Sequence, residues 1–186
     1  MPVSRLKLPL EFDAIRLRGD LGRLVPEDWS PHFNKRQYEG DWSGVALRST
    51  PGARVPLYPN PTMKEFVDLP VLDRCPYIRE VLACFHCPLR VARLLRLGAG
   101  SRILEHTDYN LGYEDGEVRI HIPVQTNPEV EFVVGGEPLP MREGEAWYIN
   151  FNLPHRIHNR GTTDRIHLVI DCDLNPWLDA MFPKPA

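Results

Sequence analysis

The chain has 186 residues, enough for one domain with a sizeable core, and its 42 % hydrophobic and 25 % charged residues are typical of a globular protein. Its net charge of −3 argues against non-specific binding to nucleic acid. The sequence has no run of about 18 apolar residues, so no membrane span is expected. Residues 1–9 do not resemble a signal peptide. We therefore expect a cytoplasmic protein that binds neither nucleic acid nor a membrane.

The N-terminal half predicts a few elements joined by long loops. Residues 6–10 are expected to form an edge strand, because they contain a proline, which cannot donate to a central ladder. Apolar residues at a rough helical spacing predict a helix within residues 11–24, and a strand is expected over residues 42–47. Residues 50–62 contain four prolines and a glycine and predict an irregular segment of the kind that often lines a site or forms a lid. Helical spacing returns over residues 72–85.

From residue 89 the hydrophobic period changes from that of a helix towards two. Strands are expected over residues 89–97, 102–106, 118–125, 129–134, 138–141, 146–151, 155–159 and 165–171. Eight short strands with evenly spaced turns indicate a mainly β fold, a double-sheet jelly roll or a similar barrel. A short helix is expected within residues 174–182. With no internal repeat and no linker, we expect a single domain over residues 1–186, with its jelly-roll core at about 88–173.

Two histidines and an aspartate form a candidate metal site. His106 and Asp108 are two residues apart on an extended segment, so both side chains point to the same side. His155 follows a proline turn from which it could fold back over that spot. Two histidines and one carboxylate on one face suit non-haem Fe(II) and oxygen chemistry, because substrate and O2 need the opposite positions. The alternatives are a solvated polar edge at His106 and Asp108, and His158 in place of His155; the turn favours His155.

Basic side chains recur on the neighbouring strands. Arg165 offers a planar fork that matches a carboxylate in two hydrogen bonds. Arg119 and His121 share one face of their strand, and His121 is expected near the metal, where it could donate to a bound carboxylate. Alternation lets either Arg93 or Arg96 face inward, and we favour Arg93. The alternatives are ordinary surface arginines and a core histidine with its own partners. Because buried unpaired cations are costly, this face is expected to bind an anion near the metal.

Four segments together resemble the aspartyl/asparaginyl β-hydroxylase family of Fe(II)- and 2-oxoglutarate-dependent dioxygenases. They are Glu105-His106-Thr107-Asp108, Arg119-Ile120-His121-Ile122-Pro123, Asn150-Phe151-Asn152-Leu153-Pro154-His155 and Arg165-Ile166-His167-Leu168-Val169-Ile170-Asp171. The resemblance covers roughly residues 88–173, and the segments occur in the family's order. The strand at Arg93-Leu94 and the run over residues 119–127 also resemble bacterial free-proline hydroxylases of this group.

The resemblance implies a double-stranded β-helix, a cupin-like jelly roll, with a few flanking helices. It implies Fe(II) held by three residues, His106, Asp108 and His155. It implies 2-oxoglutarate bound by Arg165 at its far carboxylate and by His121 near the metal, with O2 as the other co-substrate. By the same analogy, substrate contacts are expected from Arg119 and Arg93.

Asp108 separates this chain from the animal members of the family, which have a glycine at that position. The expected substrate is therefore a free amino acid or a small amino-acid derivative, hydroxylated at an unactivated C–H bond with release of succinate and CO2. The alternatives are a hydroxylase of a peptide or protein side chain and a jelly-roll module that binds a metal without catalysis. The sequence leaves open which substrate is used, which carbon is attacked and how many copies of the chain assemble.

Overall fold

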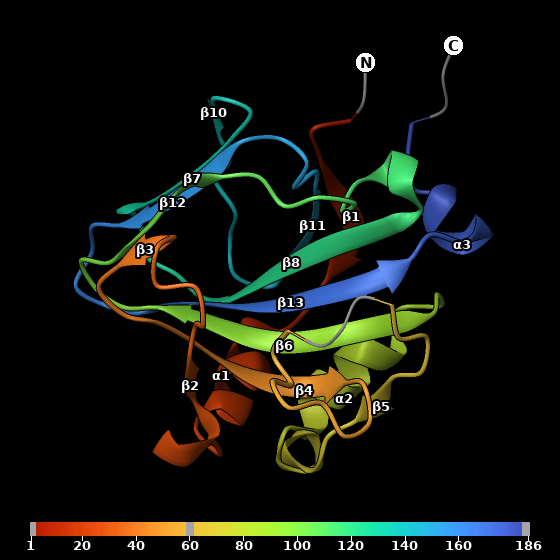
Figure 1. Cartoon of the computed structure of the whole chain (residues 1–186), viewed down its shortest axis with the longest axis horizontal. Helices are drawn as coiled ribbons and strands as arrows, with labels where there is room; N and C mark the ends of the chain where they lie inside the picture. The colour runs from red at the N-terminus through yellow and green to blue at the C-terminus, as the bar shows by residue number, and fades with distance from the viewer. Residues whose placement is uncertain (1–2, 59–61, 184–186) are drawn as a thin grey trace.

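The computed structural model describes residues 3–58 and 62–183, and two antiparallel β-sheets dominate it (Figure 1). The larger sheet has eight strands, in the order β1-β11-β8-β13-β6-β4-β2, with β5 paired to β4 off this path. The smaller sheet has five strands, in the order β10-β9-β12-β7-β3. This arrangement confirms the expected jelly roll, in which two sheets enclose a cavity.

The strands of the larger sheet are β1 (Arg5–Glu11), β2 (Ser30–Pro31), β4 (Trp42–Ser49), β5 (Val67–Asp68), β6 (Leu89–Leu97), β8 (Glu117–Gln125), β11 (Glu145–Ile149) and β13 (Arg165–Asp173). Those of the smaller sheet are β3 (Tyr38–Glu39), β7 (Arg102–His106), β9 (Val130–Val134), β10 (Glu137–Pro138) and β12 (His155–Asn159). The helices are α1 (Ala14–Leu21), α2 (Pro76–Ala83) and α3 (Pro176–Asp179), and three 3-10 turns lie at Pro26–Asp28, Pro70–Arg74 and Tyr113–Asp115.

Most expected strands and helices differ from those of the structure at their ends, and the two-residue strands β2, β3 and β5 were not expected. The helix expected over residues 72–85 is wrong as one element. Cys75, which precedes a proline, has a non-helical backbone with φ of −117° and ψ of 67°, and it separates the 3-10 turn from α2, which begins at Pro76. The strand expected over residues 138–141 is wrong except at Pro138, because β10 covers Glu137–Pro138 and Pro140, which has no N–H to donate, follows two residues later.

Two further expectations are settled in part. β1 pairs with β11 alone, as expected of an edge strand. In the segment expected to be irregular, residues 50–58 form turns, whereas residues 59–61 lie outside the described residues. The division into a single domain with a core at about 88–173 stays a prediction; β1 and β4 of the larger sheet come from before that range.

Alternation along the central strands separates a core from a cavity. Ile120 of β8 and Leu168 of β13 pack with α1 and α2 in the larger hydrophobic cluster, and both helices lie behind β6 and β4 in Figure 1. His121, next to Ile120, and His167, next to Leu168, point to the opposite side of the sheet, as successive strand residues must, and Arg165, two residues before His167, shares that side. A second hydrophobic cluster on that side includes Leu97, Ile103, Phe132, Ile149, Phe151 and Ile157. Polar side chains of the larger sheet therefore face the smaller sheet.

None of the helices in the described part of the chain is long and apolar enough to cross a membrane.

Candidate metal centre and its cavity

Neighbouring ends of β7 and β12 bring the three candidate ligands together. His106 is the last residue of β7 and pairs in register with His155, the first residue of β12. Asp108 follows β7 and is held by its backbone N–H, which donates to the carbonyl of Phe151 at 2.9 Å. One ligand atom from each of the three residues lies within 4.8 Å of the others. This spacing fits three ligands around one metal ion.

Both histidines are prepared to bind a metal through Nε2. His106 Nδ1 lies 2.8 Å from the carbonyl oxygen of Leu104, and His155 Nδ1 lies 3.0 Å from that of Leu153. Because a carbonyl oxygen only accepts, each Nδ1 carries the proton and each neutral ring keeps a lone pair on Nε2. Burial lowers the pKa of His155 to about 4, so this ring is neutral near pH 7.

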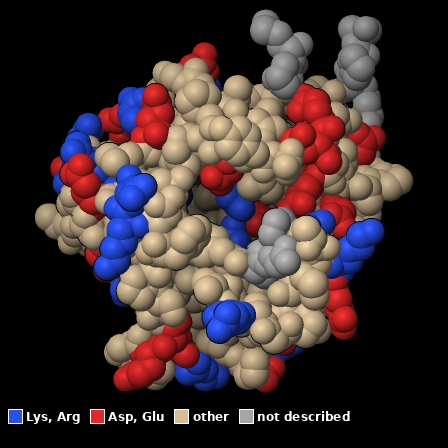
Figure 2. All heavy atoms as spheres, in the orientation of Figure 1, with Lys and Arg blue, Asp and Glu red and all other residues tan. Residues whose placement is uncertain are grey.

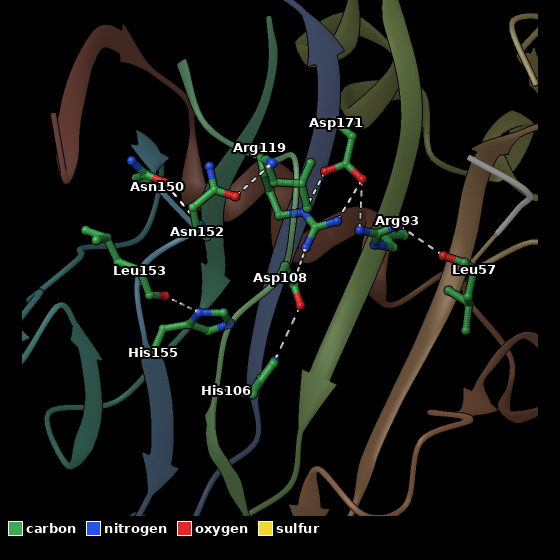
Figure 3. A network of polar contacts seen from close by, with 11 residues as sticks. Leu57, Arg93, His106, Asp108, Arg119, Asn150, Asn152, Leu153, His155 and Asp171 are labelled. Carbon is green, nitrogen blue, oxygen red and sulfur yellow. Dashed lines mark hydrogen bonds and ion pairs between the residues drawn. The ribbon is translucent and has the colours of Figure 1, made fainter. Parts of the chain in front are cut away.

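A chain of ion pairs connects Asp108 to the interior (Figure 3). Arg119 donates from Nη1 to Asp108 Oδ2 at 2.7 Å, and from Nε to Asp171 Oδ1 at 2.6 Å. Arg93 donates from Nη2 to Asp171 Oδ2 at 3.0 Å and from Nη1 to the carbonyl of Leu57 at 3.0 Å. Burial raises the pKa of Asp171, but the two guanidinium groups outweigh burial and hold it below its usual value. Since Asp108 Oδ2 is engaged, Oδ1 is the oxygen left for a metal.

Arg165 is buried and pairs with no carboxylate of the described residues. Its side chain is 1 % exposed, and its Nε has no hydrogen-bond partner among the described residues. Its Nη2 lies 2.9 Å from His167 Nδ1, and the Phe132 ring lies 5.5 Å from its Cζ. Burial lowers the pKa of Arg165 to about 9. A cation in this setting lacks the charge partner that buried cations normally have.

The His121 ring contacts two residues of the site, Phe151 and His167. Its ring stacks on Phe151 with centroids 5.1 Å apart, and its Nδ1 is 3.2 Å from His167 Nδ1. Since Arg165 always donates, His167 Nδ1 accepts, and a neutral His121 places its own proton on Nδ1 towards the same atom. His121 Nε2 then has a lone pair and no partner within the described part of the chain. The pKa values of His121 and His167 lie well below the usual value. Burial is the larger cause, and the positive charge of Arg165 is the second.

A cavity of about 460 Å³ joins the three candidate ligands to the arginines and to His121. It opens on the face shown in Figure 2, where basic side chains are visible inside the hollow. It is lined by His32, Phe33, Asn34, Gln37, Trp42, Tyr58, Arg93, Leu95, Ile103, His106, Thr107, Asp108, Tyr109, Leu111, Arg119, His121, Phe151, His155, Ile157 and Arg165. A volume of this size accommodates a small ligand together with a co-substrate.

The structure places every expected site residue on this cavity. The candidate ligands, the two candidate co-substrate residues and the two candidate substrate residues all line it. The rejected alternatives lie elsewhere: Arg96 donates from Nε to Ser43 Oγ at 3.0 Å, and neither Arg96 nor His158 lines the cavity. The roles given to the residues stay predictions.

Sequence reasoning missed several residues around the cavity. Alternation on β13 puts His167 on the same face as Arg165, but it gave His167 no role in the site. Asp171 is six residues after Arg165, so the same alternation would have found it. Tyr58 lies in the segment of residues 50–62, which was expected to line a site or form a lid, and it does line the cavity. For His32 and Trp42 the sequence offered no pattern that points to a site.

Comparison with known proteins gives consistent results. A family model described as aspartyl/asparaginyl beta-hydroxylase matches residues 14–174. L-proline cis-4-hydroxylase of Rhizobium meliloti (strain 1021) is 27 % identical over 164 residues, which are 87 % of this chain and 58 % of that protein. The chain thus spans less than two thirds of the length of this relative.

Solved structures share the fold. An oxidoreductase of the 2OG-Fe(II) oxygenase family from Burkholderia pseudomallei superposes with a TM-score of 0.60 at 19 % identity, covering 91 % of this chain and 85 % of that one. A non-haem alpha-ketoglutarate-dependent carbocyclase from nogalamycin biosynthesis gives 0.59 at 12 % identity, with 97 % and 87 % covered. A prolyl-4-hydroxylase from Pseudomonas putida gives 0.54 at 11 % identity, with 92 % of each chain covered.

Proposed function

The chain belongs to the aspartyl/asparaginyl β-hydroxylase family, and from that membership we propose that it is an Fe(II)- and 2-oxoglutarate-dependent dioxygenase. It hydroxylates an unactivated C–H bond of a free amino acid or a small amino-acid derivative, and it releases succinate and CO2. The similarity to an L-proline cis-4-hydroxylase supports a free amino acid as substrate.

The observation that carries the proposal is the pairing of a facial ligand set with a buried, unpaired cation. His106, Asp108 and His155 offer two neutral nitrogens and one carboxylate oxygen on one side of a shared point. This donor set suits Fe(II) that keeps positions open for other ligands. On the same cavity, Arg165 has no carboxylate among the described residues, so a dicarboxylate that reaches the metal with one end would supply it with the other.

Each residue has a defined task in this proposal. When bound, Fe(II) and 2-oxoglutarate supply the activation of O2, which converts 2-oxoglutarate to succinate and CO2 and delivers the second oxygen atom to the C–H bond. Arg165 holds the far carboxylate in its guanidinium fork. His121 donates to a bound carboxylate only if Nε2 gains a proton, because the neutral ring has its proton on Nδ1 towards His167.

The arginine pair on Asp171 orients both the metal ligand and the substrate. Arg119 of β8 fixes the Asp108 carboxylate through Oδ2, and Arg93 of β6, on the other side of β13, lines the same cavity. The charges of Arg93 and Arg119 balance those of Asp108 and Asp171. A bound divalent metal ion therefore leaves the site positive, which favours an anionic substrate. Arg93 and Arg119 are therefore the substrate-binding residues that we propose.

A second candidate, hydroxylation of a peptide or protein side chain, is favoured by one observation. A groove of about 270 Å³ meets the main cavity at Phe33 and Tyr58. It would accommodate residues that flank a modified side chain, whereas a free amino acid leaves it empty.

The test is a turnover assay with purified protein, Fe(II), ascorbate, 2-oxoglutarate and air, run over a panel of free amino acids and short peptides. We expect one substrate class to release succinate in step with a product 16 mass units heavier (one oxygen atom). The His155→Ala and Arg165→Ala variants should show neither product. Metal binding without succinate release over the whole panel would contradict the proposal and favour a module that binds metal without catalysis.

A further inference from the structure

Aromatic rings form the wall of the cavity opposite the co-substrate residues. The rings of His32 and Trp42 stack with centroids 3.5 Å apart, and Tyr58 meets His32 edge-on at 4.7 Å. Phe33 packs on Tyr58 at 4.7 Å and is 64 % exposed at the cavity mouth. Such a wall suits the apolar body of a ligand.

The cavity has no carboxylate left for a substrate ammonium group. Asp108 is the one acid among its described lining residues, and its two oxygens face Arg119 and the metal site. Two more acids, Asp171 and Glu117, line an adjoining pocket that shares Tyr58 with the cavity. Asp171 already accepts three N–H groups, two from Arg119 and one from Arg93, and Glu117 pairs with Arg90 at 3.3 Å. The other side-chain acceptors on the described lining are uncharged; among them are Asn34, Gln37, Thr107 and the lone pair of His121 Nε2.

Hydrogen-bond donors, by contrast, are in surplus. The Tyr58 hydroxyl, Trp42 Nε1 and Arg93 Nε are buried and have no partner in the described ranges. Burial raises the pKa of Tyr58 to about 12, so its hydroxyl stays a donor. His32 Nδ1 accepts the N–H of Asn34 at 3.2 Å, so the proton of the neutral ring is on Nε2. Buried donors without partners cost free energy that an incoming acceptor recovers.

We propose that this half of the cavity recognises its substrate by a carboxylate attached to an apolar body, and that the substrate's amino group contributes little to binding. The carboxylate is bound by Arg93 and the Tyr58 hydroxyl, and the body lies against the stacked rings of Trp42 and His32. The inference deepens the proposed function and rests on it. Its consequence is that derivatives with an acylated nitrogen, or with carbon in place of nitrogen, bind as well as the free amino acid.

Three probes with the same ring size test this: cyclopentanecarboxylate, proline and pyrrolidine. Each is titrated by calorimetry into protein loaded with Zn(II) and 2-oxoglutarate, which cannot turn over. We expect the two carboxylates to bind within about tenfold of each other, since a charged partner for the ammonium would be worth roughly 10- to 100-fold. Pyrrolidine should bind at least about 100-fold more weakly.

Three results would overturn the inference: proline binding more than about tenfold tighter than cyclopentanecarboxylate, pyrrolidine matching either, or neither carboxylate binding at millimolar concentration. Repeating the titrations with Zn(II) alone separates this inference from the proposed function. If 2-oxoglutarate fails to bind, the proposed function fails, whereas the order of the three probes still tests the aromatic half.

The Tyr58→Phe variant keeps the ring and removes the hydroxyl. We expect it to weaken cyclopentanecarboxylate by about tenfold and to leave 2-oxoglutarate binding unchanged. The matched control is Tyr77→Phe, because Tyr77 accepts the N–H of Asp13 at the start of α1 and does not line the cavity. Unchanged affinity in Tyr58→Phe would count against the proposed position of the carboxylate.

Discussion

Arg165 is in an environment that favours ligand binding over stability. Arg165 is 1 % exposed, and in the described part of the chain its guanidinium makes a polar contact with a nitrogen of His167. Replacing a buried charge by an apolar side chain of similar length is often neutral or stabilising. We therefore expect Arg165→Met to leave the free energy of unfolding of the ligand-free protein equal or higher, and to weaken 2-oxoglutarate by about 100-fold.

Urea unfolding of the ligand-free variant measures the free energy of unfolding. Calorimetric titration of the zinc-loaded variant with 2-oxoglutarate measures the affinity. Arg96→Met is the control, because Arg96 is on β6 and does not line the cavity. A large loss of stability with unchanged affinity would show that Arg165 is structural.

Asp171 has the opposite role, because it neutralises two buried cations. Asp171→Ala leaves Arg93 and Arg119 without their shared carboxylate, and we expect the free energy of unfolding to fall by about 3–5 kcal/mol. Asp173→Ala on the same strand is the control. Its half-exposed carboxylate pairs with Arg90 at 3.2 Å, and a surface pair of this kind contributes about 1 kcal/mol or less. Denaturant unfolding of the two variants should separate them clearly; equal losses would contradict this role of Asp171.

The strand β4 positions the aromatic half of the cavity through Gly44. A Cβ at Gly44 would lie 2.8 Å from the carbonyl oxygen of Leu94 and 2.9 Å from Leu57 Cδ2, and the Leu57 carbonyl accepts from Arg93. We expect Gly44→Ala to lower the free energy of unfolding by about 1–3 kcal/mol and to weaken carboxylate probes.

Gly19 in α1 provides the matched control for this strand. No atom lies within 4 Å of a Cβ at Gly19, and alanine is the better helix former by about 1 kcal/mol. The midpoint temperature of thermal unfolding should therefore fall in Gly44→Ala and rise in Gly19→Ala. A stabilised Gly44→Ala protein would contradict the close packing of β4 on β6.

The strands that form the site could be predicted well because they follow the two-residue period. Alternation placed Arg165 and Arg93 on the cavity side of β13 and β6. The same period puts His167 on the face of Arg165, and extending it by four residues would have added Asp171. The aromatic half was not predictable, because His32 lies in a loop and Tyr58 in a turn-rich segment, where no repeating pattern relates sequence to direction. Their positions depend on tertiary contacts such as the stack on Trp42.

The whole molecule should become less stable in mild acid when no metal is bound. Burial lowers the pKa of four histidines: His32 and His155 to about 4, and His121 and His167 well below the usual value. The unfolded chain then binds more protons than the folded one between about pH 6.5 and pH 4, so stability rises with pH in this window and is lost as the pH falls. Each histidine contributes up to about 1.4 kcal/mol per pH unit.

Urea unfolding at pH 7, 6 and 5 measures this slope. His32→Phe keeps an aromatic ring on Trp42 and should reduce the slope by about one proton. A stability that stays constant or rises as the pH falls from 7 to 5 would contradict the burial of these rings in the neutral form.

The most direct test of the account is an anaerobic titration of the Fe(II)-loaded protein with 2-oxoglutarate, followed by visible absorption. We predict that the weak charge-transfer band of 2-oxoglutarate chelated to Fe(II) appears with one equivalent of 2-oxoglutarate. The band should be lost in His155→Ala, which removes a metal ligand, and should require far more 2-oxoglutarate in Arg165→Met. A parent protein that binds reduced iron at His106, Asp108 and His155 and shows no band would contradict the dioxygenase assignment and leave a jelly roll that binds metal for another purpose.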